Sequence, residues 1–184
     1  MHGKCGTVCG VSPWFARIDV SQATVAQRRV VQGICDLLDQ LRPTKLDPTR
    51  QVIEPENGET WVKLRHNADP HLHIDLVLAD GWVHFYGLMG HDESYSTRAE
   101  PSDAWEGETV EMLGDLLQAE YTFDRYDLAG KHWREVVRIG EPYNKDIHRG
   151  PMPFSLLPLQ RWATHGETRR TSFECRGTRL DQRP

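Results

Sequence analysis

The sequence predicts an α+β protein with a single antiparallel sheet of about five or six strands and two helices packed on one face of that sheet. Three observations predict this class. Apolar residues alternate on both sides of Asp80-Gly81, two segments carry apolar residues at a helical period, and the order is helix, three or four strands, helix, two strands. Strands that follow one another without intervening helices favour antiparallel pairing with the helices gathered on one face.

The first helix is expected from Ser21, a good N-cap, to about Arg42, where Pro43 ends it. Its apolar positions recur at intervals of three and four and form one stripe. They are Ala26, Val30, Val31, Ile34, Leu37, Leu38 and Leu41. This stripe needs an apolar surface against which it can be buried.

The strands that follow form an antiparallel meander. Residues 51–54 and 59–65 read as strands joined by the turn Glu56-Asn57-Gly58, and residues 71–89 read as a hairpin around Asp80-Gly81. Asp-Gly between alternating apolar runs is a strong signal for a two-residue type I′ turn. We therefore expect Ala79 opposite Trp82. The register that results also pairs Leu78 with Val83, Val77 with His84, Leu76 with Phe85, Asp75 with Tyr86 and Ile74 with Gly87.

This register sorts the side chains onto two faces, because neighbouring residues of a strand point to opposite sides. The inward set is apolar: Val62, Leu64, Leu72, Ile74, Leu76, Leu78, Val83, Phe85 and Met89. The outward set mixes aromatic, charged and histidine residues: Trp61, Lys63, Arg65, His73, Asp75, Trp82, His84 and Tyr86. The helices are expected to cover the inward face.

The second half is expected to contain a polar loop at 91–98, a helix beginning near Pro101-Ser102-Asp103, and strands at 121–126 and 133–139. Beyond Gly140 the chain is rich in proline and arginine and is expected to be irregular, with residues 154–162 docking as a short helical piece. We expect a flexible N-terminal segment at 1–12, one domain at 13–165 and a disordered basic tail at 166–184.

Composition narrows the function classes. The 184-residue chain carries a formal net charge of −5 and contains no apolar run of the roughly 20 residues that a membrane helix needs. Its first residues lack the apolar centre of a signal peptide, so we expect a cytoplasmic protein without a membrane partner. An acidic body repels nucleic acid and favours a basic protein partner.

Candidate chemistry is sparse. The chain has no Walker, Gly-x-Gly-x-x-Gly or Gly-x-Ser-x-Gly pattern, so we expect neither catalysis nor a cofactor. The alternative is an enzyme or sensor that binds a metal through His71, His73 and His84. In the expected register His73 faces Leu88 and His84 faces Val77, so these three ligands do not converge on one point.

The outward face suggests binding instead, because Trp, Tyr and Arg are enriched at protein–protein hot spots. The expected partner-binding residues are Trp61, Arg65, His73, Asp75, Trp82, His84 and Tyr86 on the sheet and Asp92, Glu93 and Tyr95 in the loop. In the alternative, a C-terminal segment containing Phe154, Leu156, Leu157 and Trp162 folds over this face and makes it a second core layer.

Three features resemble the immunity proteins that neutralise polymorphic bacterial toxins. They are the strand Trp61-x-Lys63-x-Arg65, the hairpin Asp80-Gly81-Trp82 and the acidic segment from Glu108 to Trp133, within residues 20–140. The resemblance implies a stoichiometric inhibitor that occludes a toxin's active site and is a monomer or weak dimer when free. The element order also resembles small secretion chaperones, which usually end in a further amphipathic helix and dimerise; the proline-rich end here departs from that pattern.

Overall fold

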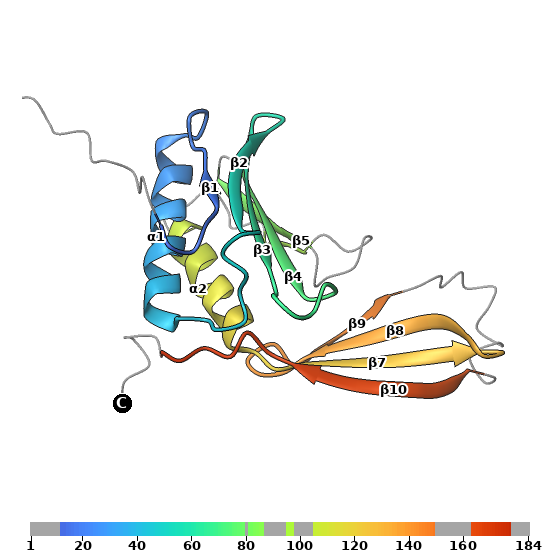
Figure 1. The fold of residues 1–184 in the computed structure, drawn as a ribbon. Coiled ribbons are helices and arrows are strands. Elements are labelled where there is room, and N and C mark those ends of the chain that lie inside the picture. The colour runs from blue at the N-terminus through green and yellow to red at the C-terminus, as the bar shows by residue number, and fades with distance from the viewer. Residues whose placement is uncertain (1–11, 80, 87–94, 98–104, 150–162, 178–184) are drawn as a thin grey trace, which may run out of the picture.

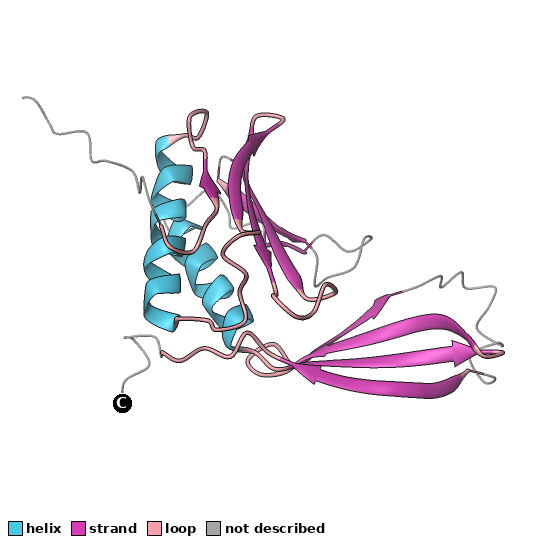
Figure 2. Cartoon of the chain, viewed as in Figure 1, coloured by secondary structure: helices cyan, strands magenta, loops and turns pink. Residues whose placement is uncertain are grey.

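The computed structural model describes residues 12–79, 81–86, 95–97, 105–149 and 163–177, which form two sheets and two helices (Figure 1, Figure 2). The first sheet has the strand order β1 (Arg17–Ile18), β2 (Val52–Glu56), β3 (Glu59–Arg65), β4 (His73–Ala79), β5 (Trp82–Tyr86) and β6 (Tyr95–Thr97). The second has the order β10 (Thr164–Thr171), β7 (Tyr121–Leu128), β8 (Lys131–Ile139) and β9 (Lys145–Arg149). The α+β class is therefore correct, but the expectation of a single sheet is wrong.

The first helix, α1 (Val25–Leu41), begins three residues later than Ser21 would place it. Thr24 is the N-cap: its hydroxyl accepts from the backbone N–H of Gln27, and the Gln27 side chain accepts from the Thr24 N–H at 2.9 Å. This reciprocal capping box satisfies two N–H groups that the helix itself cannot pair. The expected C-terminal end is confirmed, since Arg42 adopts a left-handed conformation (φ 48°) directly before Pro43.

The central hairpin has the predicted register, with Ala79 opposite Trp82 and Asp75 opposite Tyr86. The preceding hairpin between β2 and β3 turns at Asn57 (φ 54°) and Gly58 (φ 82°), the pair of positive φ angles that a type I′ turn requires. Asp80, Gly87 and Met89 lie outside the described residues.

The inward face of the first sheet is buried against both helices, as Figure 1 shows. Val62, Leu64, Leu72, Ile74, Leu76, Leu78, Val83 and Phe85 are each no more than 3% exposed. Each fully buried aliphatic or Phe side chain contributes about 1.5–3 kcal/mol relative to an exposed one. The second helix, α2 (Trp105–Gln118), packs against α1, and residues 101–104, where it was expected to begin, lie outside the described residues.

The second sheet projects from one end of this assembly and is referred to here as the arm; α1, α2 and the first sheet form the body (Figure 1). The two predicted strands at 121–126 and 133–139 are present and pair with each other. They do not join the first sheet, because β10 occupies the other edge of β7 and β9 the other edge of β8. Tyr121, Phe123, Val137 and Ile139 on the arm join the same apolar core as the helices.

The expectation of a disordered tail at 166–184 is wrong for residues 166–177. Most of β10 falls in this range, and residues 172–177, the strap, return to the body beside the segment after α1. Phe173 is fully buried, and the N–H of Gly177 donates to the Leu41 carbonyl at 2.8 Å. A Cβ on Gly177 would lie 1.8 Å from the Gln40 carbonyl oxygen, so this close approach requires glycine.

Residues 1–11, 150–162 and 178–184 lie outside the described residues, and with them the expected N-terminal segment, helical piece and final tail. Ser12, the last residue of the expected N-terminal segment, is described and buried. Neither described helix is long and apolar enough to cross a membrane.

Candidate protein-binding face

The side of the first sheet that faces away from the helices, here called the outer face, is built by the register of four strands. Trp61 on β3 lies opposite Val77 on β4, which lies opposite His84 on β5, which lies opposite Ser96 on β6. The next row along the sheet contains Lys63, Asp75 and Tyr86. Each residue of these rows is fixed by backbone pairing on rigid strands, so the face is preorganised for contact.

Aromatic rings cover the middle of the outer face. The rings of Trp61 and Tyr86 stack at 5.7 Å with an interplanar angle of 15°. His84 lies between Trp82, whose ring it meets edge-on at 4.1 Å, and Tyr86 at 5.8 Å. Offset stacking and edge-to-face contacts are the favoured arrangements of such rings. Trp61, Trp82, His84 and Tyr86, together with Val77, are called the aromatic cluster from here on.

Val77, at the centre of the aromatic cluster, is only 1% exposed although it points away from the helices. Two ring nitrogens in the cluster, Nε1 of Trp61 and Nδ1 of His84, are buried and have no hydrogen-bond partner among the described residues. Buried polar atoms normally have a partner, and a missing one costs about 1–3 kcal/mol. Tyr86, in contrast, is 37% exposed and is one of two large apolar side chains among the described residues with such exposure.

Charged residues flank the aromatic cluster in compensated pairs. Lys63 lies 2.8 Å from Glu54 on β2 and places its ammonium 5.4 Å from the centre of the Trp61 ring. Arg65 and Asp75 form an ion pair across β3 and β4. These pairs hold long side chains in fixed positions around the rings, where they form a polar rim around an apolar centre.

Most of the predicted partner-binding residues share this face. Trp61, Arg65, His73, Asp75, Trp82, His84 and Tyr86 all belong to it by register. Tyr95 lies in β6 opposite Phe85, whose side chain is buried against the helices. Asp92 and Glu93 lie outside the described residues.

The three histidines of the metal hypothesis do not come together. His73 is opposite Arg65, His84 is opposite Val77, and His71 lies in the turn between β3 and β4. Among the described residues no group of three His, Cys, Asp or Glu side chains is placed to hold a metal ion.

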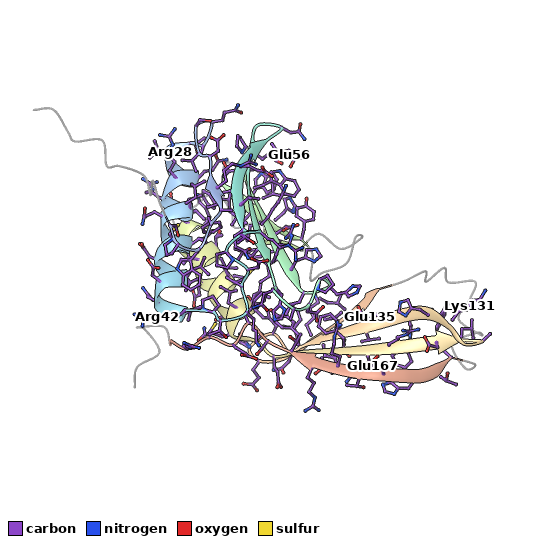
Figure 3. The ribbon with its side chains drawn as sticks, viewed as in Figure 1. Arg28, Arg42, Glu56, Lys131, Glu135 and Glu167 are labelled. Atoms are coloured by element: carbon purple, nitrogen blue, oxygen red, sulfur yellow. The ribbon has the colours of Figure 1, made fainter. Side chains whose placement is uncertain are left out.

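A cavity of about 420 Å³ lies where the arm meets the turn between β3 and β4. Its lining residues come from four segments: His71, Phe123, Arg125, His132, Glu135, Glu167 and Arg169. Figure 3 labels Glu135 and Glu167 on the arm. Sequence reasoning missed this cavity because it depends on β10, whose polar sequence carries no strand periodicity.

The two arginines that line this cavity are paired with aspartates of the same chain. Arg169 forms an ion pair with buried Asp69 at 3.0 Å and lies 4.6 Å from the centre of the Phe123 ring. Arg125 donates to Asp127 at 2.8 Å. Both arginines are thus held by aspartates, and two glutamates, Glu135 and Glu167, line the cavity beside them.

A second polar cluster lies on the arm around Asp124, which is 3% exposed. Burial raises the pKa of this carboxyl, but hydrogen bonds from Thr168 and His165 and the charge of Arg138 outweigh it and lower the pKa overall. Thr168 and Asp124 both contact Nε2 of His165, at 2.9 and 3.4 Å. A catalytic triad needs the hydroxyl and the carboxylate on opposite ring nitrogens, so this cluster holds strands together rather than activating a nucleophile.

Comparisons with protein-family models, curated proteins and solved structures found no match to this chain.

Proposed function

We propose that this chain is a protein-binding module, an immunity protein that neutralises a cognate bacterial toxin by stoichiometric binding in the cytoplasm. The aromatic cluster carries the proposal. Clustered Trp and Tyr side chains with a charged rim are the composition of an interface hot spot. On a sheet face exposed only to water we would expect Thr, Lys and Glu rather than Trp and Tyr.

The two buried ring nitrogens that lack a partner among the described residues support the same proposal. Nε1 of Trp61 is a donor, and Nδ1 of His84 is either a donor or an acceptor. A partner that reorders these rings on binding can supply the missing hydrogen bonds. The free-energy cost of the unpaired nitrogens in the free protein is then removed on binding, which strengthens the complex.

The position of the arm favours a partner with a protruding element. Figure 1 shows the arm extending from the body on the side to which the outer face looks. The outer face and the arm therefore meet at an angle, here called the corner, and the 420 Å³ cavity lies at its vertex. A toxin that inserts the rim of its active site into this corner touches both walls and loses access to its substrate.

The formal net charge of −5 favours a basic partner, because opposite charge raises the rate of encounter. We expect the free protein to be a monomer or weak dimer.

Co-expression with the product of the gene immediately upstream tests the proposal. We expect a one-to-one complex that survives purification and relief of the growth defect that the upstream product causes alone. A variant with both Trp61→Ala and Tyr86→Ala should lose the complex and the rescue, whereas Val25→Ala should keep both. Val25 is the matched control because it is 69% exposed on α1, away from the outer face. A harmless upstream product that forms no complex would contradict the assignment.

A further inference from the structure

A buried histidine joins three segments of the chain: the turn 66–72, the strap and the segment after α1. His66, 3% exposed, follows β3 and begins the turn 66–72 that leads to β4. Its ring lies edge-on to Phe173 of the strap, with centres 5.6 Å apart. The backbone N–H of the next residue, Asn67, donates to Lys45 in the segment after α1.

Hydrogen bonds define the protonation state of this ring. Nδ1 accepts from two backbone N–H groups, those of Ala68 at 3.2 Å and Asp69 at 2.8 Å. An N–H group cannot accept, so Nδ1 carries no proton. The proton is therefore on Nε2, which donates to the Ser172 carbonyl in the strap at 3.3 Å. His66 is neutral in this arrangement and uses both nitrogens.

The turn that His66 closes positions the groups at the vertex of the corner. Asp69 forms the ion pair with Arg169 of β10, and its other carboxylate oxygen accepts from the N–H of His71 at 3.0 Å. His71 and Arg169 both line the cavity. The chain of contacts thus runs from the His66 ring through Asp69 to the arm.

We propose that His66 is a proton-sensitive latch: adding a proton to Nδ1 in mildly acidic solution opens the turn 66–72 and separates Asp69 from Arg169 and His71 from the cavity. A protonated Nδ1 would point its N–H at two backbone donors, so both hydrogen bonds are lost together. The corner is then intact at neutral pH and partly opened in acid. This pH response is a property beyond partner binding itself.

Burial sets the sign of the effect, and the charged groups around the ring modify it. Asp69 in the turn and Glu174 in the strap favour the protonated ring, whereas Lys45 opposes it. Burial is the largest influence, and the pKa of His66 is lowered from its usual 6.5. Because the folded pKa lies below the unfolded one, the stabilisation is complete above pH 6.5 and is lost as the pH falls through the folded value.

Backbone amide exchange of the intact chain tests the latch. We expect protection of residues 66–72 and 172–173, corrected for intrinsic rates, to fall as the pH is lowered from 7.5 to 5, because the open turn takes up the proton at the ordinary pKa of 6.5 and the closed turn only at a lower pH. Residues 30–38 of α1 should keep their protection, which distinguishes local opening from unfolding. Equal loss in α1, or no loss in the turn, would overturn the proposal.

Two further measurements keep the test decisive. His66→Asn supplies an amide oxygen that accepts from the turn and does not titrate, so amide exchange of this variant should not depend on pH beyond the intrinsic rates. The control Val25→Ala, exposed on α1, should behave as wild type. If His66→Asn fails to fold, nitrogen NMR of the wild-type ring decides. A neutral ring with its proton on Nε2 and a pKa below 6.5 is the expected result; a proton on Nδ1 at neutral pH would refute the latch.

Discussion

Single residues determine where the elements of this chain begin. Ser21 and Thr24 are both good N-cap residues, and sequence alone favoured the first. Thr24 is the N-cap because Gln27 lies three residues later and completes the capping box. The backbone N–H of Ser21 instead donates to Asp19 in the preceding turn at 3.0 Å.

This assignment predicts opposite results for two similar substitutions. Thr24→Ala should lower the free energy of unfolding by about 1 kcal/mol, because it removes the acceptor for the Gln27 N–H. Ser21→Ala should change it by less than about 0.5 kcal/mol, as surface substitutions usually do. Urea denaturation of both variants measures the difference, and equal losses would mean that the helix begins elsewhere.

At the scale of elements, the strongest local signals predicted the structure best. The register of the central hairpin followed from Asp80-Gly81 and the alternation around it, because a slip of one residue would bury histidines and expose leucines. The strand β10 could not be predicted in this way. Its residues, Thr164–Thr171, are mostly polar and exposed, and they form a strand because the edge of β7 offers hydrogen-bond partners.

The contact between the two helices depends on a close approach at Gly33. A Cβ at this position would lie 2.8 Å from a methyl group of Val110 on α2. Gly107, also on α2, has open space around it. The two glycines therefore have the same helix propensity but different surroundings.

Alanine substitutions should separate propensity from packing. Gly107→Ala should stabilise the fold by up to about 1 kcal/mol, the usual difference between alanine and glycine in a helix. Gly33→Ala should gain nothing or destabilise, because overpacking costs about 1–3 kcal/mol. In a Val110→Ala background Gly33→Ala should become stabilising. Thermal unfolding of Gly107→Ala, Gly33→Ala, Val110→Ala and the Gly33→Ala/Val110→Ala double variant tests this coupling. Additive effects of Gly33→Ala and Val110→Ala would exclude it.

At the scale of the whole molecule, the sequence predicted the outer face but not the corner. Seven of the eight described residues proposed for binding lie together on that face, because local pairing alone places them there, and Tyr95 is the exception. The arm and its cavity depend on contacts between segments far apart in the sequence, such as His66 with Ser172 and Asp69 with Arg169. Hydrophobic periodicity and turn motifs indicate only local structure along the chain, so they do not predict contacts between such distant residues.

The central claim is that the outer face binds a protein partner. Once the partner is purified, its affinity for Tyr86→Ala is the most direct test, measured by calorimetry beside the thermal unfolding of the same variant. Tyr86 is 37% exposed and stacks on Trp61, so its removal should cost the fold no more than about 1 kcal/mol. As a hot spot it should cost binding at least about 2 kcal/mol, roughly a 30-fold weaker complex.

Val25→Ala is the matched control and should change neither quantity by more than about 0.5 kcal/mol. Weak binding together with near-normal unfolding of Tyr86→Ala would establish the outer face as the interface. Undiminished binding would contradict that claim, and so would a large loss of stability, which would make the aromatic cluster part of the core.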